Sequence, residues 1–329
     1  MPSLFKKMLC VCTLLSYSHL IHTMQDPHIL FAQLSIEVAS KDFDPEQIKV
    51  EMGAQAASHG DLESLRNFIN SSNVNKLTND KLRVFHHAIL FAEKSRNEAQ
   101  YQPIFDYLLS QGAEIQNHIN GEKMPPVIFA TSIGCLKGYA RPIEILLEKG
   151  ADPFISNKGA CPALICVVAK NQKENSLGAL AILKLFQQRA STLYQAVQCL
   201  DIEKVKQFAN ADTIKNSEEC PLSLSFAHWE QGIHESLPVI EILLTQGANP
   251  NAQLKNQMPG MTFLMLSTRH ALKTGDTRLI ELCLKHKGNP KYKAFPMALS
   301  AIDLVKVAAQ IEPNNSHIPK IRSILNTEA

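Results

Sequence analysis

Histidine is the side chain in this sequence that most readily suggests metal binding or acid–base chemistry, and its spacing favours neither. His86 and His87 are adjacent, so a single helix cannot direct both rings at one metal ion. His228 and His234 are six residues apart, across an expected loop. We therefore interpret these histidines as structural and expect no metal ion and no cofactor.

The eight cysteines also lack a metal-binding pattern, because no Cys-x-x-Cys pair and no Cys/His cluster has zinc spacing. Two of them, Cys10 and Cys12, lie in an apolar stretch at the N-terminus. The others are Cys135, Cys161, Cys166, Cys199, Cys220 and Cys283. Several stand where small, buried helix residues are expected. We interpret them as reduced core thiols, which favours a reducing compartment.

The sequence contains none of the common catalytic signatures, namely HExxH, GxSxG, the Walker phosphate loop and GxGxxG. Lys and Arg number 33 against 31 Asp and Glu, whereas phosphate binding needs a concentrated excess of cations. We therefore expect neither an enzyme nor a nucleic-acid partner. Hydrophobic residues make up 45% and aromatic ones only 6%, which favours a helical core over a β-sandwich.

The N-terminus has the layout of a secretory signal peptide. A basic pair, Lys6 and Lys7, precedes an apolar run over residues 8–15, and Ser16-Tyr17-Ser18 offers the small residues that a signal peptidase prefers. We interpret residues 1–23 as a leader and expect export. The alternative is that translation starts at an internal methionine, Met24, and that the protein is cytoplasmic. No segment reaches the roughly 18 apolar residues that a transmembrane helix needs, so we expect none.

An apolar stripe that ends at a glycine recurs along the chain. The copies are residues 105–113, 143–153, 240–250 and 280–290, and their glycines are Gly112, Gly150, Gly247 and Gly288. A glycine there ends a helix in the left-handed conformation without steric cost. Asp-Pro or Asn-Pro follows in three copies and turns the chain away. Each stripe must be covered by a neighbouring element.

A second recurring sequence motif begins each unit, whereas the glycine-ended stripe closes it. Its copies are residues 159–166, 220–227, 260–268 and 300–305, with a fragment at residues 85–88. Together the two motifs resemble the ankyrin repeat, which begins with Thr-Pro-Leu-His-x-Ala and ends with Gly-Ala-Asp-x-Asn. The resemblance covers residues 53–329. It implies an all-α ankyrin-repeat solenoid of helix–turn–helix units with short hairpin loops, stacked so that each buries its neighbour's apolar faces.

We count about eight units, beginning near residues 53, 82, 124, 161, 192, 220, 261 and 299. Most are longer than the family's repeat of about 33 residues. The extra residues, which we call inserts, lie between the two motifs, at residues 94–102, 135–141, 171–177, 231–238 and 271–277. This predicts either longer inter-helix loops or extended first helices. Residues 24–52 are interpreted as an N-terminal cap, and an irregularity near residues 190–220 would bend or divide the array.

The ankyrin family binds partners on a concave face built from hairpin tips and from two variable positions of each first helix. The resemblance therefore implies partner contacts at Ala227, His228, Arg269 and His270. Trp229 beside them is either a binding anchor or a filler over the long insert. The hairpin tips would carry Asn120, Glu122, Asn157, Lys158, Lys255 and Asn256, which are otherwise ordinary solvated turn residues.

The resemblance implies a monomeric protein-interaction module with a protein partner. Degenerate, elongated repeats behind a signal-like leader further suggest an exported bacterial effector that acts on a host protein. One alternative is a regulator or enzyme whose activity lies in the inter-helix inserts. Another is a structural or self-assembling protein that associates through an uncapped end of the stack.

Overall fold

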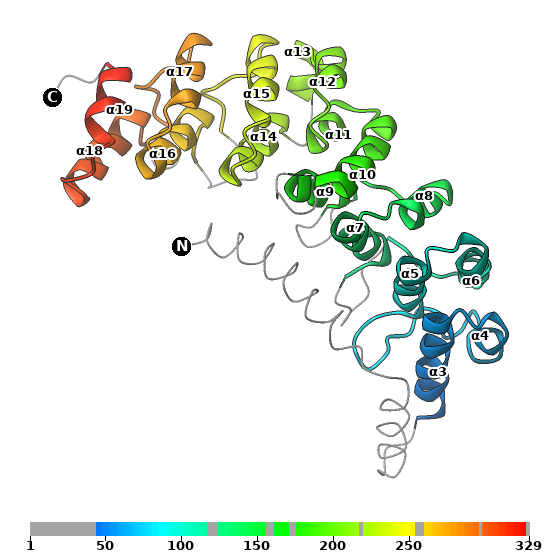
Figure 1. Cartoon of the computed structure of the whole chain (residues 1–329). Coiled ribbons are helices and arrows are strands. Elements are labelled where there is room, and N and C mark those ends of the chain that lie inside the picture. The colour runs from blue at the N-terminus through cyan, green and yellow to red at the C-terminus, as the bar shows by residue number, and fades with distance from the viewer. Residues whose placement is uncertain are drawn as a thin grey trace. The chain divides into compact units, whose positions relative to one another are not determined.

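A computed structural model describes residues 44–116, 124–155, 161–170, 176–216, 220–253, 260–295 and 298–326. Within these ranges the chain forms 17 α-helices, and its only β-structure is isolated bridges (Figure 1). The prediction of an all-α protein is thereby confirmed. None of these helices has the length and apolarity that crossing a membrane requires. The chain divides into two compact units, Met1–Leu183 and Lys184–Ala329, which are described in turn.

Helices in the first unit form two rows. They are α3 (Pro45–His59), α4 (Leu62–Phe68), α5 (Val84–Ser95), α6 (Glu98–Ser110), α7 (Pro126–Lys137), α8 (Arg141–Glu148), α9 (Pro162–Lys170) and most of α10 (Ser176–Arg189). In one row α5 packs between α3 and α7, and α7 packs on α9, while α4 packs on α6 in the other (Figure 1). Helix α7 is consequently buried at every position from Pro126 to Cys135.

The second unit repeats this arrangement. Its helices are α11 (Leu193–Gln198), α12 (Ile202–Phe208), α13 (Ala211–Asn216), α14 (Pro221–Glu230), α15 (Ser236–Thr245), α16 (Phe263–Thr274), α17 (Arg278–Lys285), α18 (Ala301–Ile311) and α19 (Ile318–Ile324). Helix α14 contacts α11 and α16, and α16 contacts α18. Helix α15 contacts α12 and α17. First helices therefore pack on first helices and second helices on second helices.

The predicted helix-ending glycines are confirmed at three of four positions. Gly112, Gly150 and Gly247 have φ angles of 85, 90 and 102°, in the left-handed region. The prediction is wrong for Gly288, because Lys287 adopts the left-handed conformation instead, with φ of 64°. Gly288 is needed for a different reason, since a Cβ there would lie 2.7 Å from the carbonyl oxygen of Cys283.

The inserts lie partly in helices and partly in short turns. Residues 96–97 separate α5 from α6, 138–140 separate α7 from α8, 231–235 separate α14 from α15, and 275–277 separate α16 from α17. The insert at residues 271–277 extends a first helix, as one of the two alternatives predicts. The insert at residues 94–102 lies mainly in the second helix α6, and the insert at residues 231–238 lies mainly in the turn before α15. The insert at residues 171–177 lies largely outside the described residues.

The N-terminal boundary differs from the sequence analysis. Helix α3 begins at Pro45, after Asp44 caps it by accepting from the backbone N–H of Glu46 at 3.0 Å, and it continues to His59. The expected border between residues 52 and 53 thus falls within one helix. Gly53 lies inside α3 without interrupting it. The close packing of α3 explains the glycine, because a Cβ at this position would lie 2.3 Å from the side chain of Ile69. Of the expected cap over residues 24–52, residues 24–43 lie outside the described residues.

Asparagine amides join successive turns in both units. Asn75 donates to the carbonyl of Gly112 at 2.9 Å and accepts from the N–H of Glu114 at 2.8 Å. Asn251 likewise donates to the carbonyl of Lys287 at 3.1 Å and accepts from the N–H of Asn289 at 2.7 Å. Each amide therefore satisfies two backbone groups of the following helix pair. The four-residue offset of Asn251 from Gly247 is the sequence signal that could have identified it.

We expect Asn75→Ala and Asn251→Ala each to lower the free energy of unfolding by about 1–2 kcal/mol, because two backbone groups lose their partner. Urea denaturation followed by circular dichroism measures this change. Asn314→Ala, which replaces an exposed asparagine, serves as the control. Equal effects from all three substitutions would contradict a linking role for the two amides.

Candidate functional site

The structure places two residues of the expected binding patch in the core. His228 is fully buried and Trp229 is only 1% exposed. The expectation that they present a surface is therefore wrong, because α14 packs against α11, α15 and α16 and buries both faces that carry them. Ala227, on the same helix, is half-buried.

Trp229 fills the space around the inserts of the second unit. The Arg278 guanidinium lies 4.7 Å from the centroid of its ring, a cation–π distance. The ring of His234 packs at 5.0 Å and that of His270 at 6.3 Å, both edge-on. This arrangement favours the filler alternative over the binding anchor. Sequence reasoning missed Arg278, which the chain places at the start of the next second helix.

Arg269 and His270 lie on α16, at the edge of this cluster. Both side chains are half-buried, and Arg269 pairs with Glu230 at 2.9 Å. His270 packs edge-on against Phe226 at 6.4 Å, and burial lowers the pKa of its ring. The structure therefore brings Trp229, Arg269 and His270 together in one packed cluster. Arg269 lies at the edge of this cluster and makes that edge polar.

The expected hairpin-tip contacts fall outside the described residues. They are Asn120, Glu122, Asn157, Lys158, Lys255 and Asn256. Their participation in binding stays a prediction.

A groove of about 870 Å³ follows α16 and α18 and includes Arg269 on its wall. Its apolar lining is Met261, Leu272, Leu304, Val307, Ala308, Ile311 and Pro313. Its polar lining is Arg269, Lys273, Glu312, Asn314, Asn315, Ser316 and His317. Val307 and Ile311 are 42% and 74% exposed, so the groove presents large apolar side chains to solvent. We call it the α16–α18 groove.

The turn that closes one end of the α16–α18 groove is fixed to α16. Asn315 donates its amide to the carbonyl of Leu272 at 3.1 Å. The ring of His317 covers Gly275, where a Cβ would lie 2.8 Å from it. At the other end, Ser300 and Asp303 form a reciprocal capping box that starts α18. The groove is therefore built from elements that hydrogen bonds and close packing hold in place.

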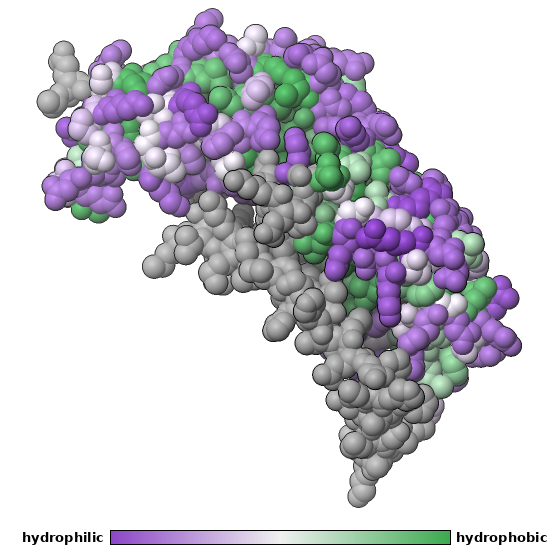
Figure 2. All heavy atoms as spheres, in the orientation of Figure 1, coloured by the Kyte–Doolittle hydropathy of each residue, from purple (hydrophilic) through white to green (hydrophobic). Residues whose placement is uncertain are grey.

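Other exposed apolar side chains stand apart from this groove. Leu177 and Phe295 are 82% and 81% exposed, and neither lines it. On the face shown in Figure 2, hydrophilic residues cover much of the described surface and apolar patches lie between them. The α16–α18 groove differs from Leu177 and Phe295 in combining exposed apolar side chains with a concave surface.

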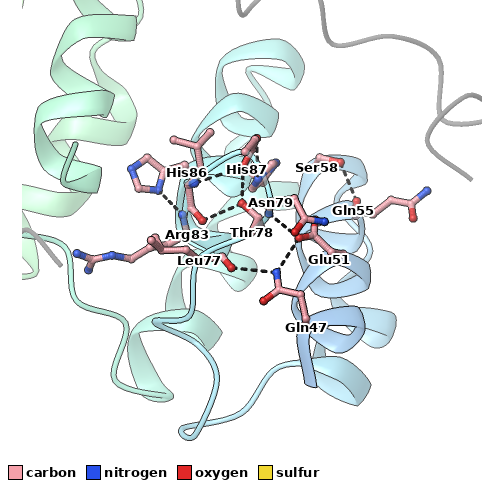
Figure 3. A network of polar contacts seen from close by, with 12 residues as sticks. Gln47, Glu51, Gln55, Ser58, Leu77, Thr78, Asn79, Arg83, His86 and His87 are labelled. Carbon is pink, nitrogen blue, oxygen red and sulfur yellow. Dashed lines mark hydrogen bonds and ion pairs between the residues drawn. The ribbon is translucent and has the colours of Figure 1, made fainter. Parts of the chain in front are cut away.

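In the first unit, a polar network ties the hairpin before α5 to α3 (Figure 3). The amide of Gln47 donates to the carbonyl of Leu77 at 3.0 Å, and Glu51 accepts from the backbone N–H of Asn79 at 2.6 Å. The hairpin itself closes through a bridge between Leu77 and Arg83. These contacts engage backbone groups of the hairpin, so we interpret the network as structural.

His86 belongs to the same region and bonds to backbone atoms on both sides. Its Nδ1 accepts from the N–H of Arg83 at 2.9 Å, which leaves Nε2 as the donor to the carbonyl of Met124 at 2.8 Å. Burial lowers the pKa of His86 to about 3. His86 therefore stays neutral and links one helix pair to the turn before α7.

The inserts of the first unit pack on one another. The hydroxyl groups of Tyr101 and Tyr139 are 2.8 Å apart, and Arg141 pairs with Glu98 at 2.7 Å. The hydrogen bond from Arg141 holds the pKa of Glu98 below its usual range. In the second unit the Arg278 guanidinium lowers the pKa of Asp276 in the same way. These carboxylates stay ionised, whereas a general acid needs a raised pKa.

The sequence matches no model of a known protein family and no curated protein. The resemblance to ankyrin repeats therefore stays a prediction.

Acid should destabilise the fold through its buried histidines, because burial lowers the pKa of His86, His87 and His228 below the ordinary value. Burial lowers the pKa of His228 to about 4, and neither of its ring nitrogens has a hydrogen-bond partner among the described residues. Below a pH of about 6.5 each of these histidines binds a proton in the unfolded chain but stays neutral in the folded chain. The free energy of unfolding therefore falls until the pH reaches the pKa of the histidine in the folded chain. The loss is about 1.4 kcal/mol per pH unit for each histidine.

We expect His228→Gln to reduce this slope by about one proton between pH 6.5 and 4. Urea denaturation at several pH values measures it. The difference between the two proteins at pH 8, where the buried histidines are neutral, gives the packing effect alone. A slope that is unchanged by the substitution would contradict the burial of a neutral His228.

Proposed function

We propose that this chain is an ankyrin-type solenoid that binds a partner protein. The fold part of the proposal is supported by the row-on-row packing of first and second helices in each unit. It is also supported by the left-handed glycines at Gly112, Gly150 and Gly247 and by the amides of Asn75 and Asn251, which join neighbouring turns. Stacked units of this kind form extended binding surfaces.

The α16–α18 groove is the proposed contact surface. The observation that carries this choice is the exposure of Val307 and Ile311 inside a preformed concave surface. An apolar centre with a polar rim is the usual anatomy of a protein interface. Arg269 supplies part of that rim, so one residue of the expected patch keeps its proposed role. A rigid surface also avoids much of the ordering cost of binding.

We expect the double substitution Val307→Ser and Ile311→Ser to weaken partner binding at least tenfold, about 1.4 kcal/mol, with little change in thermal stability. The partner is first identified with a photo-cross-linking residue at position 311 of the full chain. Titration calorimetry with the purified partner then measures Kd.

Leu177→Ser combined with Phe295→Ser provides the matched control, because both side chains are exposed and lie outside the groove. This control should bind as the unmodified chain does. Equal weakening by both double variants would show that the α16–α18 groove is not the contact surface.

We further propose that the protein acts as a monomer after export and that its partner is a protein of a host cell. The basic pair Lys6-Lys7 and the apolar run at residues 8–15 support export. The charge balance of 33 cations against 31 anions supports a protein partner over nucleic acid.

Leader cleavage provides a direct test of export. N-terminal sequencing of the protein from its native source should find a mature chain that lacks the leader within residues 1–23. Leu14→Asp combined with Leu15→Asp should block processing, because two charges interrupt the apolar run. A mature protein that still begins at Met1 would contradict the leader.

A further inference from the structure

Two buried cysteines meet where α7 packs on α9. The Sγ atoms of Cys135 and Cys166 are 3.3 Å apart, and both side chains are almost completely buried. The two helices are consecutive first helices, so this contact joins neighbouring helix pairs of the first unit. A shift of a little over 1 Å would bring the two sulfurs to the covalent distance of about 2.05 Å.

The other described cysteines have different surroundings. Cys161 donates to the carbonyl of Pro153 at 3.7 Å, and Cys199 donates to the carbonyl of Gln195 at 3.2 Å. Cys283 lies 3.8 Å from the hydroxyl of Ser267. Cys220 is partly exposed. Cys161 also lies near Cys166. The sulfur–sulfur contact at 3.3 Å joins Cys135 to Cys166.

We propose that Cys135 and Cys166 are a disulfide site that cross-links α7 to α9. The oxidant is a disulfide, either a small-molecule disulfide or a dithiol oxidoreductase in its oxidised form. One cysteine, as its thiolate, attacks a sulfur of the oxidant, breaks the oxidant's S–S bond, expels its other sulfur as a thiolate that takes up a proton, and forms a mixed disulfide. The second then attacks that bond, closes the Cys135–Cys166 disulfide and releases the oxidant as its reduced thiol. The protein loses two protons and two electrons, and the oxidant gains them.

The bond forms while the chain folds rather than afterwards. Burial raises the pKa of the Cys166 thiol well above its ordinary value, so the folded core holds little thiolate. During folding the same thiols are exposed and ionise more readily. Once α7 and α9 pack together, the geometry brings this pair together among the six cysteines that the structure describes.

Oxidative refolding tests the proposal on the full chain. The reduced, unfolded protein is refolded at pH 8 in a mixture of reduced and oxidised glutathione, and remaining thiols are then alkylated. Trypsin releases residues 124–137 with Cys135 and residues 159–170 with both Cys161 and Cys166. We expect these two peptides to be joined, with a mass two hydrogens below their sum and with fragmentation placing the bond at Cys166. Dithiothreitol should separate them.

Two matched variants distinguish the neighbouring cysteines. Cys161→Ser should keep the joined peptides, and Cys166→Ser should lose them. The oxidised protein should also unfold several degrees above the reduced protein, because the cross-link restricts the unfolded chain. Recovery of Cys135 and Cys166 of the unmodified chain as alkylated thiols, as glutathione adducts or in bonds to other cysteines would overturn the proposal.

Discussion

Burial of each helix pair's apolar stripe against the next pair is the interaction on which the rest of this structure depends. A single pair cannot cover its own stripe, so packing extends from neighbour to neighbour. Helix α7 has α5, α8 and α9 around it and is buried throughout its first ten residues, whereas α17 buries only Leu279, Ile280 and Cys283. In the described part of the second unit, α18 is the last first helix. Its side chains Val307 and Ile311 consequently remain exposed.

Much of this architecture could be predicted from the sequence, because it follows from local rules. Glycines after apolar stripes marked helix ends, and only Gly288 failed, since the left-handed residue there is Lys287. The sequence left open whether inserts lengthen loops or helices, and the short turns at residues 96–97 and 275–277 decide for helices in those units. Such choices depend on contacts between inserts, such as Arg141 with Glu98, which are over 40 residues apart.

The candidate site was harder to predict for the same reason. His228 occupies an expected variable position of a repeat and Trp229 follows it, but the turn before α15 supplies His234 and the start of α17 supplies Arg278 to cover the indole. Positions that a standard repeat would expose to solvent are therefore buried in the hydrophobic core of this protein. Exposed apolar side chains gather instead at the α16–α18 groove, and its wall includes Arg269 from the original patch. The groove could not be read from the sequence, because it depends on how α18 and the turn after it pack against α16.

Native-state hydrogen exchange after one core substitution tests neighbour-to-neighbour stacking most directly. Val305 is buried in α18, and Val305→Ala should weaken packing on α16 and α19. Stacking between neighbours predicts faster amide exchange in α16, α18 and α19, with α3 to α6 unchanged. Equal loss of protection in α3 to α6 would contradict it, since the chain would then unfold as one cooperative core.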